Sequence, residues 1–246
     1  MDQQTRAALK QDKFITSTSH GLEWASENRR SVITTTAIML AAIVLLVLSG
    51  VIYSKRSDAA AVAFGAAMQE YQTPLAQPGQ QVPPGVKTYA SIAARAKAAN
   101  ALFSSVADQY GMTPSGRNAR YFAGLTEIES GQMQQAEETL KKVANGWDSN
   151  LAGLAKFALA QLYRDTGRND QAIDLYQGMM KKPTTTVPAS LAQLQLADIY
   201  QAEGNTAESK KLLADLKDKD SKGPAGAIAA QKLNPTRAGA GEIPQQ

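Results

Sequence analysis

The chain has 246 residues, 26 of them basic and 22 acidic, so its net charge is +4. It contains no cysteine and one histidine, His20, which excludes a disulfide framework, a thiolate zinc site, a cysteine nucleophile and a lipid-modified cysteine. Alanine occurs 42 times while aromatic residues make up only 6%, a composition that favours closely packed helices over sheet.

Residues 1–31 form a polar head in which we expect two short helices, over residues 5–16 and 20–28. The following residues 32–53 read VITTTAIMLAAIVLLVLSGVIY and carry no charge. A helix of this length spans roughly 33 Å, enough to cross the hydrocarbon core of a bilayer. Because the apolar region is longer than that of a cleaved signal peptide, we predict a retained transmembrane helix, a signal anchor.

The distribution of basic residues predicts the orientation of this helix. Basic pairs flank both ends, but Lys10 and Lys13 add to the N-terminal side, whereas no basic residue follows Arg56 until Lys87. This bias places the N-terminus in the cytoplasm and the C-terminal domain outside. We therefore expect a single-pass protein of the bacterial inner membrane with a periplasmic domain, and the lack of cysteine is compatible with that compartment.

Residues 54–85 are predicted to hold an alanine-rich juxtamembrane helix and then a loop. The helix, over residues 57–72, is either capped at Ser57 or Asp58 or continuous with the transmembrane helix. Residues 73–85 contain four prolines and two glycines, which is typical of a loop. A helical pattern resumes over residues 87–110.

An internal repeat is the strongest signal in the chain. Gly131, Gly167 and Gly204 stand 36 and 37 residues apart, and each is followed by a small residue after five positions and by bulky apolar residues after nine and twelve. Pairs containing small residues also precede each glycine. The small residues that follow the glycines are Ala136, Ala172 and Ser209. The bulky residues that follow them are Leu140, Tyr176 and Leu213 after nine positions and Val143, Met179 and Leu216 after twelve. The repeat predicts helical hairpins that turn at glycines with positive φ and stack through the bulky residues.

This pattern resembles the tetratricopeptide repeat (TPR). In the second copy the matching residues are Leu159, Ala160, Tyr163, Gly167, Ala172 and Tyr176. The copies are longer than the usual length of about 34 residues, and the early tryptophan of the motif is replaced by Arg120, Lys156 and Gln193. The resemblance implies an all-α fold, with a single N-terminal transmembrane helix followed by an α-solenoid of three to four TPR-like hairpins over residues 86–222. The fourth, degenerate hairpin would precede the others and contain Phe103. We expect residues 223–246 to be a short helix and a flexible tail.

The resemblance also implies a concave face, lined by the first helix of each hairpin, that binds an extended or helical peptide. The motif's groove positions fall on Asn118, Tyr121 and Leu125, on Phe157, Gln161 and Arg164, and on Leu194, Asp198 and Gln201. Tyr121, Phe157 and Leu194 would form an apolar row. This row is either open to a partner or packed against a C-terminal helix as part of the core.

The sequence shows no pattern that points to catalysis. It has no phosphate-binding glycine loop and no nucleophile elbow, and its neighbouring carboxylates do not share a helix face. Its basic residues form no patch with interleaved aromatics, so we expect no nucleic-acid binding. We predict a protein that is not an enzyme and needs no cofactor or metal.

The layout of a short inside head, one span and TPR-like hairpins outside is similar to that of the single-span ancillary subunits of the bacterial SecYEG translocon. This resemblance implies a scaffold or adaptor whose partners are translocon subunits, chaperones or secreted clients. Two alternatives remain open. One is a structural accessory subunit of another envelope complex. The other is a periplasmic coordinator of cell division or wall synthesis, although no trimerising coiled coil or cleaved signal is evident.

Overall fold

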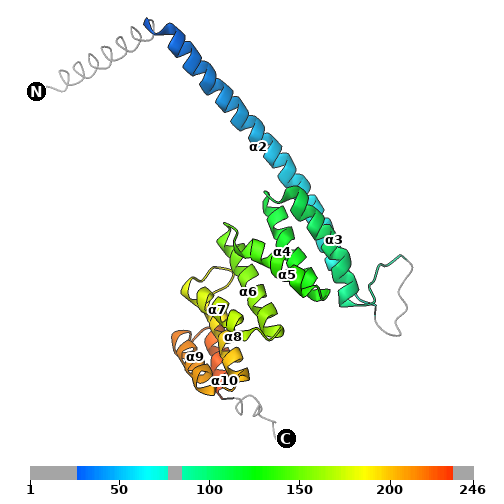
Figure 1. Ribbon diagram of the computed structural model, residues 1–246, viewed down its shortest axis with the longest axis vertical. Coiled ribbons are helices and arrows are strands. Elements are labelled where there is room, and N and C mark those ends of the chain that lie inside the picture. Colours follow the sequence, from blue (N-terminus) through cyan, green and yellow to red (C-terminus); the bar gives the residue numbers. More distant parts are fainter. Residues whose placement is uncertain (1–26, 77–84, 235–246) are drawn as a thin grey trace, which may run out of the picture. The chain divides into compact units, whose positions relative to one another are not determined.

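The computed structural model describes residues 27–76 and 85–234, and the chain divides into two units, Met1–Lys55 and Arg56–Gln246 (Figure 1). Within the described residues the regular elements are all helices, and one isolated β-bridge pairs Leu75 with Tyr89. Several predicted segments lie outside the described residues. They are the head helix over residues 5–16, nearly all of the helix over residues 20–28 with His20, the middle of the proline loop and the tail from residue 235.

Helix α2 (Arg29–Tyr71) runs without interruption through the predicted span and the juxtamembrane segment. The continuous helix is therefore observed, and a separate cap at Ser57 or Asp58 is wrong. In the first unit its large apolar side chains are exposed, and an 18-residue window has a mean hydropathy of 2.6 with none of its residues buried. This segment is long and apolar enough to cross a membrane, although an N-terminal signal sequence has the same properties.

The second unit contains the last part of α2 and eight further helices within the described residues. They are α3 (Ile92–Tyr110), α4 (Pro114–Glu129), α5 (Met133–Ala144), α6 (Ser149–Asp165), α7 (Asn169–Lys181), α8 (Ala189–Ala202), α9 (Thr206–Lys219) and α10 (Pro224–Leu233). Helix α3 begins five residues later than the helical pattern suggests, because the N–H of Tyr89 donates to the carbonyl of Pro74 and the Ser91 hydroxyl caps the helix.

The repeat forms three hairpins, α4–α5, α6–α7 and α8–α9, as predicted (Figure 1). Gly131, Gly167 and Gly204 end the first helix of each hairpin with φ values of 83°, 74° and 79°. In the second hairpin the N–H of Arg168 donates to the carbonyl of Tyr163 at 2.7 Å, the bond that closes a helix end around a left-handed residue. A Cβ atom is strained at positive φ, so the turn favours glycine at these positions.

The close approach of the helices within a hairpin depends on small residues. A Cβ on Gly124 would lie 2.7 Å from Cδ2 of Leu140, and Ala160 and Ala197 in the equivalent region are 0% and 1% exposed. The bulky residues of the second helices are buried, and Leu140 and Tyr176 are fully so. The buried residues of the second unit form three clusters along the stack, one in α2–α4, a large one centred on α5–α8 and one in α8–α10.

The predicted degenerate hairpin is also present, made of residues 56–71 of α2 and of α3. Phe64, Phe103 and Phe122 join it to α4, with ring centroids 5.3–5.8 Å apart. A guanidinium nitrogen of Arg56 donates to the carbonyl of Gln109 at 2.6 Å and so binds α2 to the end of α3. This hairpin continues the stack at its N-terminal end.

The turn glycines lead to a prediction about stability. Gly167→Ala places a side chain at φ 74°, so we expect it to lower the free energy of unfolding by about 1 kcal/mol. Gly178→Ala is the matched control, because Gly178 lies inside α7 with open space beside it and alanine favours a helix there by roughly 0.5–1 kcal/mol. Urea unfolding followed by circular dichroism measures both. Changes of the same sign in the two variants would contradict the role of the turn.

Candidate protein-binding surfaces

The predicted groove residues all lie on the first helices of the three hairpins. Asn118 and Gln201 are exposed and Leu194 is buried, while the others are partly buried. They are distributed as Asn118, Tyr121 and Leu125 on α4, Phe157, Gln161 and Arg164 on α6, and Leu194, Asp198 and Gln201 on α8.

The apolar row is not uniform along the stack. The Tyr121 ring packs edge-on against Phe122, and the Phe157 ring packs edge-on against Tyr176 at a centroid distance of 5.8 Å. Both side chains keep part of their surface open. Leu194 is only 7% exposed and belongs to a cluster with residues of α9 and α10. Of the two alternatives for the apolar row, an open surface or packing against a C-terminal helix, Leu194 shows the second.

Two of the polar groove residues already bind partners within the chain. A guanidinium nitrogen of Arg164 donates to Oε1 of Gln195 at 3.1 Å, and Lys232 of α10 forms an ion pair with Asp198 at 2.6 Å. Helix α10 thus occupies the end of the stack by both apolar and ionic contacts. The partly exposed aromatic groove residues, Tyr121 and Phe157, lie on α4 and α6.

Ion pairs and hydrogen bonds join neighbouring hairpins at the edge where the glycine turns lie. Glu137 of α5 binds Lys141 and Arg168 at 2.7 Å each and accepts a hydrogen bond from the Tyr163 hydroxyl at 3.1 Å. The donation by Lys141, with further donation by Arg168 and Tyr163, lowers the pKa of Glu137 to about 2. At the next junction Asn169 donates to Glu203 at 2.8 Å. These contacts hold each hairpin in register with the next.

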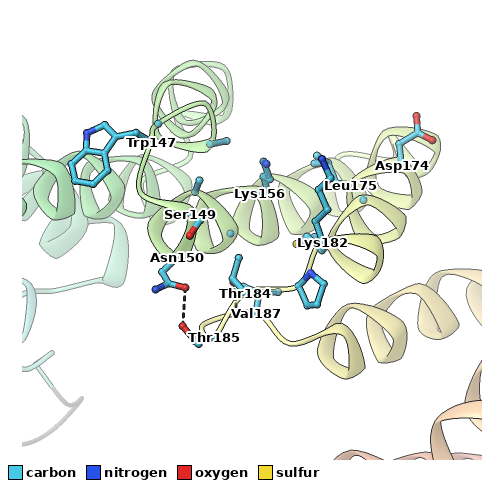
Figure 2. Close-up of a pocket in the computed structure, with 17 residues that line it drawn as sticks. Trp147, Ser149, Asn150, Lys156, Asp174, Leu175, Lys182, Thr184, Thr185 and Val187 are labelled. Atoms are coloured by element: carbon cyan, nitrogen blue, oxygen red, sulfur yellow. Dashed lines mark hydrogen bonds between the residues drawn. The ribbon is translucent and has the colours of Figure 1, made fainter. Parts of the chain in front are cut away.

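A cleft that the sequence reasoning missed lies at the other end of the second hairpin. It has a volume of about 780 Å³ and is bounded by α6, α7 and the loop after α7 (Figure 2). The Thr185 hydroxyl donates to Asn150 at 2.7 Å, and a Cβ on Gly153 would come within 2.7 Å of the Thr184 hydroxyl oxygen. The sequence hinted at this cleft only through the length of the repeats, 36 and 37 residues, and through the prolines near the loops between hairpins.

The geometry defines the second unit as an α-solenoid of helical hairpins, and comparison with known proteins identifies its class. Residues 23–183 match the family model described as a tetratricopeptide repeat-like domain. The chain belongs to this family.

Solved structures agree with that assignment. Two crystal structures of TPR-like repeats from a putative kinesin light chain of Podosopora anserina, one of them a variant, have TM-scores of 0.51 and 0.50. Their sequences are 18% and 19% identical to this one, over 72% of this chain and 87% of theirs. No curated protein matches the chain. The comparisons confirm the TPR-like fold, an architecture that commonly serves as a scaffold for protein–protein interactions.

The Glu137 cluster leads to a prediction about pH. Because the folded pKa of about 2 lies below the ordinary value of 4.5, the cluster stabilises the fold at neutral pH and loses its effect as pH falls from about 4.5 to about 2. We expect Glu137→Gln to lower the free energy of unfolding by about 1 kcal/mol at pH 7, since solvent around Arg168 screens the pair.

The measurement is urea unfolding of both proteins between pH 7 and pH 2. The difference between them should shrink below about pH 4. Glu138→Gln, at the exposed neighbouring position on α5, is the control and should change little. A difference that stays constant down to pH 2 would show that the carboxylate charge is not responsible.

Proposed function

We propose that this protein is a membrane-anchored scaffold whose TPR-like unit binds other proteins on the outer side of the bacterial inner membrane, at the Sec translocon and its chaperone network. The observation that carries the proposal is α2. Between Arg30 and Lys55 this helix carries no charge and exposes apolar side chains, and its last part belongs to the helical-hairpin unit.

The side chains of α2 support a lipid environment. In water, each exposed Leu or Ile forgoes roughly 1.5–3 kcal/mol that burial would provide. Several hydroxyls of the segment form hydrogen bonds within the helix, since those of Thr34 and Thr35 donate to the carbonyls of Arg30 and Ser31 at 2.9 and 2.8 Å. Ser49 donates to the carbonyl of Leu46 in the same way. Hydroxyls bonded within the helix lower the cost of placing it in lipid.

The first-helix surface around α4 and α6 supports binding of a peptide or a protein segment. Tyr121 and Phe157 are partly exposed aromatic residues on neighbouring hairpins, and Gln161 stands beside them on α6. Aromatic side chains with adjacent polar groups are the residues that provide most binding energy in protein interfaces. A translocon-associated scaffold would use this surface for chaperones or secreted clients.

Membrane extraction tests the anchor. We expect the full-length chain to stay in the membrane pellet after alkaline carbonate treatment, because the span is retained and not cleaved. Mass spectrometry of the pelleted protein should recover peptides from residues 1–31. A mature chain that begins after residue 53 and is released by carbonate would show that the segment is a signal sequence.

Site-specific photocrosslinking in intact cells tests the partners. A benzoylphenylalanine probe at Val44 should capture translocon subunits, and probes at Tyr121 and Phe157 should capture chaperones or secreted clients. The control probe replaces Lys210, which is exposed on α9 away from this surface, and should give no shared product.

Other products would support one of the alternatives. One fixed set of unrelated subunits at every position would identify a structural accessory subunit of another envelope complex. Proteins of cell division or wall synthesis at Tyr121 and Phe157 would identify a coordinator of those processes. Either result would contradict the translocon assignment.

A further inference from the structure

Two large apolar side chains protrude from consecutive loops between hairpins. Trp147, between α5 and α6, is 79% exposed, and Met112, between α3 and α4, is 85% exposed. Arg117 connects them, because its guanidinium carbon lies 4.4 Å from the centre of the Trp147 ring and its Nη1 donates to the Met112 carbonyl at 3.0 Å. The exposed indole is thus held in place by a cation–π contact.

The surface beside Trp147 is positively charged. A hollow of about 190 Å³ next to the indole is lined by Arg117, Arg120 and Lys142. Its acidic residue, Asp148, caps α6, since its Oδ1 accepts the N–H groups of Asn150 and Leu151 at 3.1 and 3.2 Å. The negative charge in the hollow is therefore already used to stabilise a helix N-terminus.

The positive charge continues on the other side of the indole. Trp147 also lines the 780 Å³ cleft, whose charged lining residues are Lys156, Lys182 and Asp174 (Figure 2). In the part of the chain that the structure describes, none of the five cations at the two hollows is in an ion pair. The edge thus has an excess of positive charge around one exposed aromatic ring.

The two arginines retain hydrogen-bonding capacity. A guanidinium has five N–H donors, and Arg117 and Arg120 each give one to a backbone carbonyl, those of Met112 and Ala107. The Nε of Arg117 is buried and has no hydrogen-bond partner among the described residues. Such a planar fork suits bidentate binding of a carboxylate.

We propose that this edge, formed by Met112, Trp147, Arg117, Arg120 and Lys142, binds an acidic segment of a protein partner. Carboxylates of the segment contact the two arginines and Lys142, and an apolar side chain covers Trp147 and Met112. Trp, Met and Arg are the residue types enriched in the centres of protein interfaces. The concave hollows and the arginine forks favour a peptide over a flat lipid surface. The site includes Arg117 and Arg120 of α4, near the N-terminal end of the first-helix surface, and does not depend on the membrane anchor.

The test uses the full-length chain in detergent with Trp24→Phe, which leaves Trp147 as the only indole, because the chain contains two tryptophans. The probe is the acetylated and amidated peptide DEELDEFE, and the control peptide is NQQLNQFQ. We expect the acidic peptide to shift Trp147 emission to shorter wavelength, with binding that weakens as salt rises. The neutral peptide should give no shift below about 1 mM.

Variants then test which cationic residues bind the acidic peptide. Arg117→Gln and Lys142→Gln should each weaken binding of the acidic peptide about tenfold, since each removes one charged hydrogen bond. Lys142 is exposed, so its variant keeps the test valid if Arg117→Gln disturbs the loop. The matched control is Lys210→Gln, on the exposed face of α9, which should bind as the parent does.

Several outcomes would overturn the proposal. They are absence of binding up to about 1 mM acidic peptide, equal binding of the neutral peptide, and equal losses in Lys142→Gln and Lys210→Gln. A fourth is a blue shift of Trp147 in nanodiscs of phosphatidylglycerol, without peptide, that the acidic peptide does not alter. That result would make an anionic lipid surface the occupant of this edge.

Discussion

Small residues at the helix crossings, glycine and alanine, let the helices of the second unit pack closely, and the rest of its structure depends on this close packing. Gly124 faces Leu140 so closely that a methyl group in its place would overlap the leucine side chain. Gly116 is still more constrained, since a Cβ there would lie 1.9 Å from the carbonyl oxygen of Tyr110. The alanine-rich composition follows from this constraint. It lets each bulky residue of a second helix fill the space between two hairpins, which stabilises the stack by dense packing.

The two edges of the stack differ because different residues join the hairpins there. At the edge of the glycine turns, Glu137 forms an ion pair with Arg168 across a junction and accepts a hydrogen bond from the Tyr163 hydroxyl. At the other edge the loop after α7 is held by hydroxyl groups, such as that of Thr186, whose Oγ1 donates to the carbonyl of Asn150 at 2.7 Å. Among the described residues, the cations near those loops, such as Arg117 and Arg120, form no ion pair. The two edges therefore differ in how their charged side chains are paired.

The C-terminal helix limits where a partner can bind. Helix α10 buries Leu194 and pairs with Asp198 through Lys232, so the last hairpin is covered by the chain itself. A covering helix removes the apolar surface that an unpartnered end of a solenoid would expose to water. The open surfaces are those of the earlier hairpins, at Tyr121 and Phe157 on one face and at Trp147 on the loop edge.

The sequence by itself determined the helical hairpins, their turns and the apolar span. These features are local, because a glycine at positive φ, a small residue at a helix crossing and an uncharged run of 22 residues each act within a few turns of chain. The repeat also indicated correctly that Phe103 belongs to a fourth hairpin.

Only the tertiary structure decided which surface residues are available. The sequence left open whether a C-terminal helix would cover Leu194, and Arg164 gives no sign that Gln195 will bind it, since these contacts join separate helices. The hollow beside Trp147 likewise depends on Arg117 from the preceding hairpin. Periodicity specifies the face of a helix on which a residue lies, whereas its exposure and charge environment depend on what the rest of the chain places beside it.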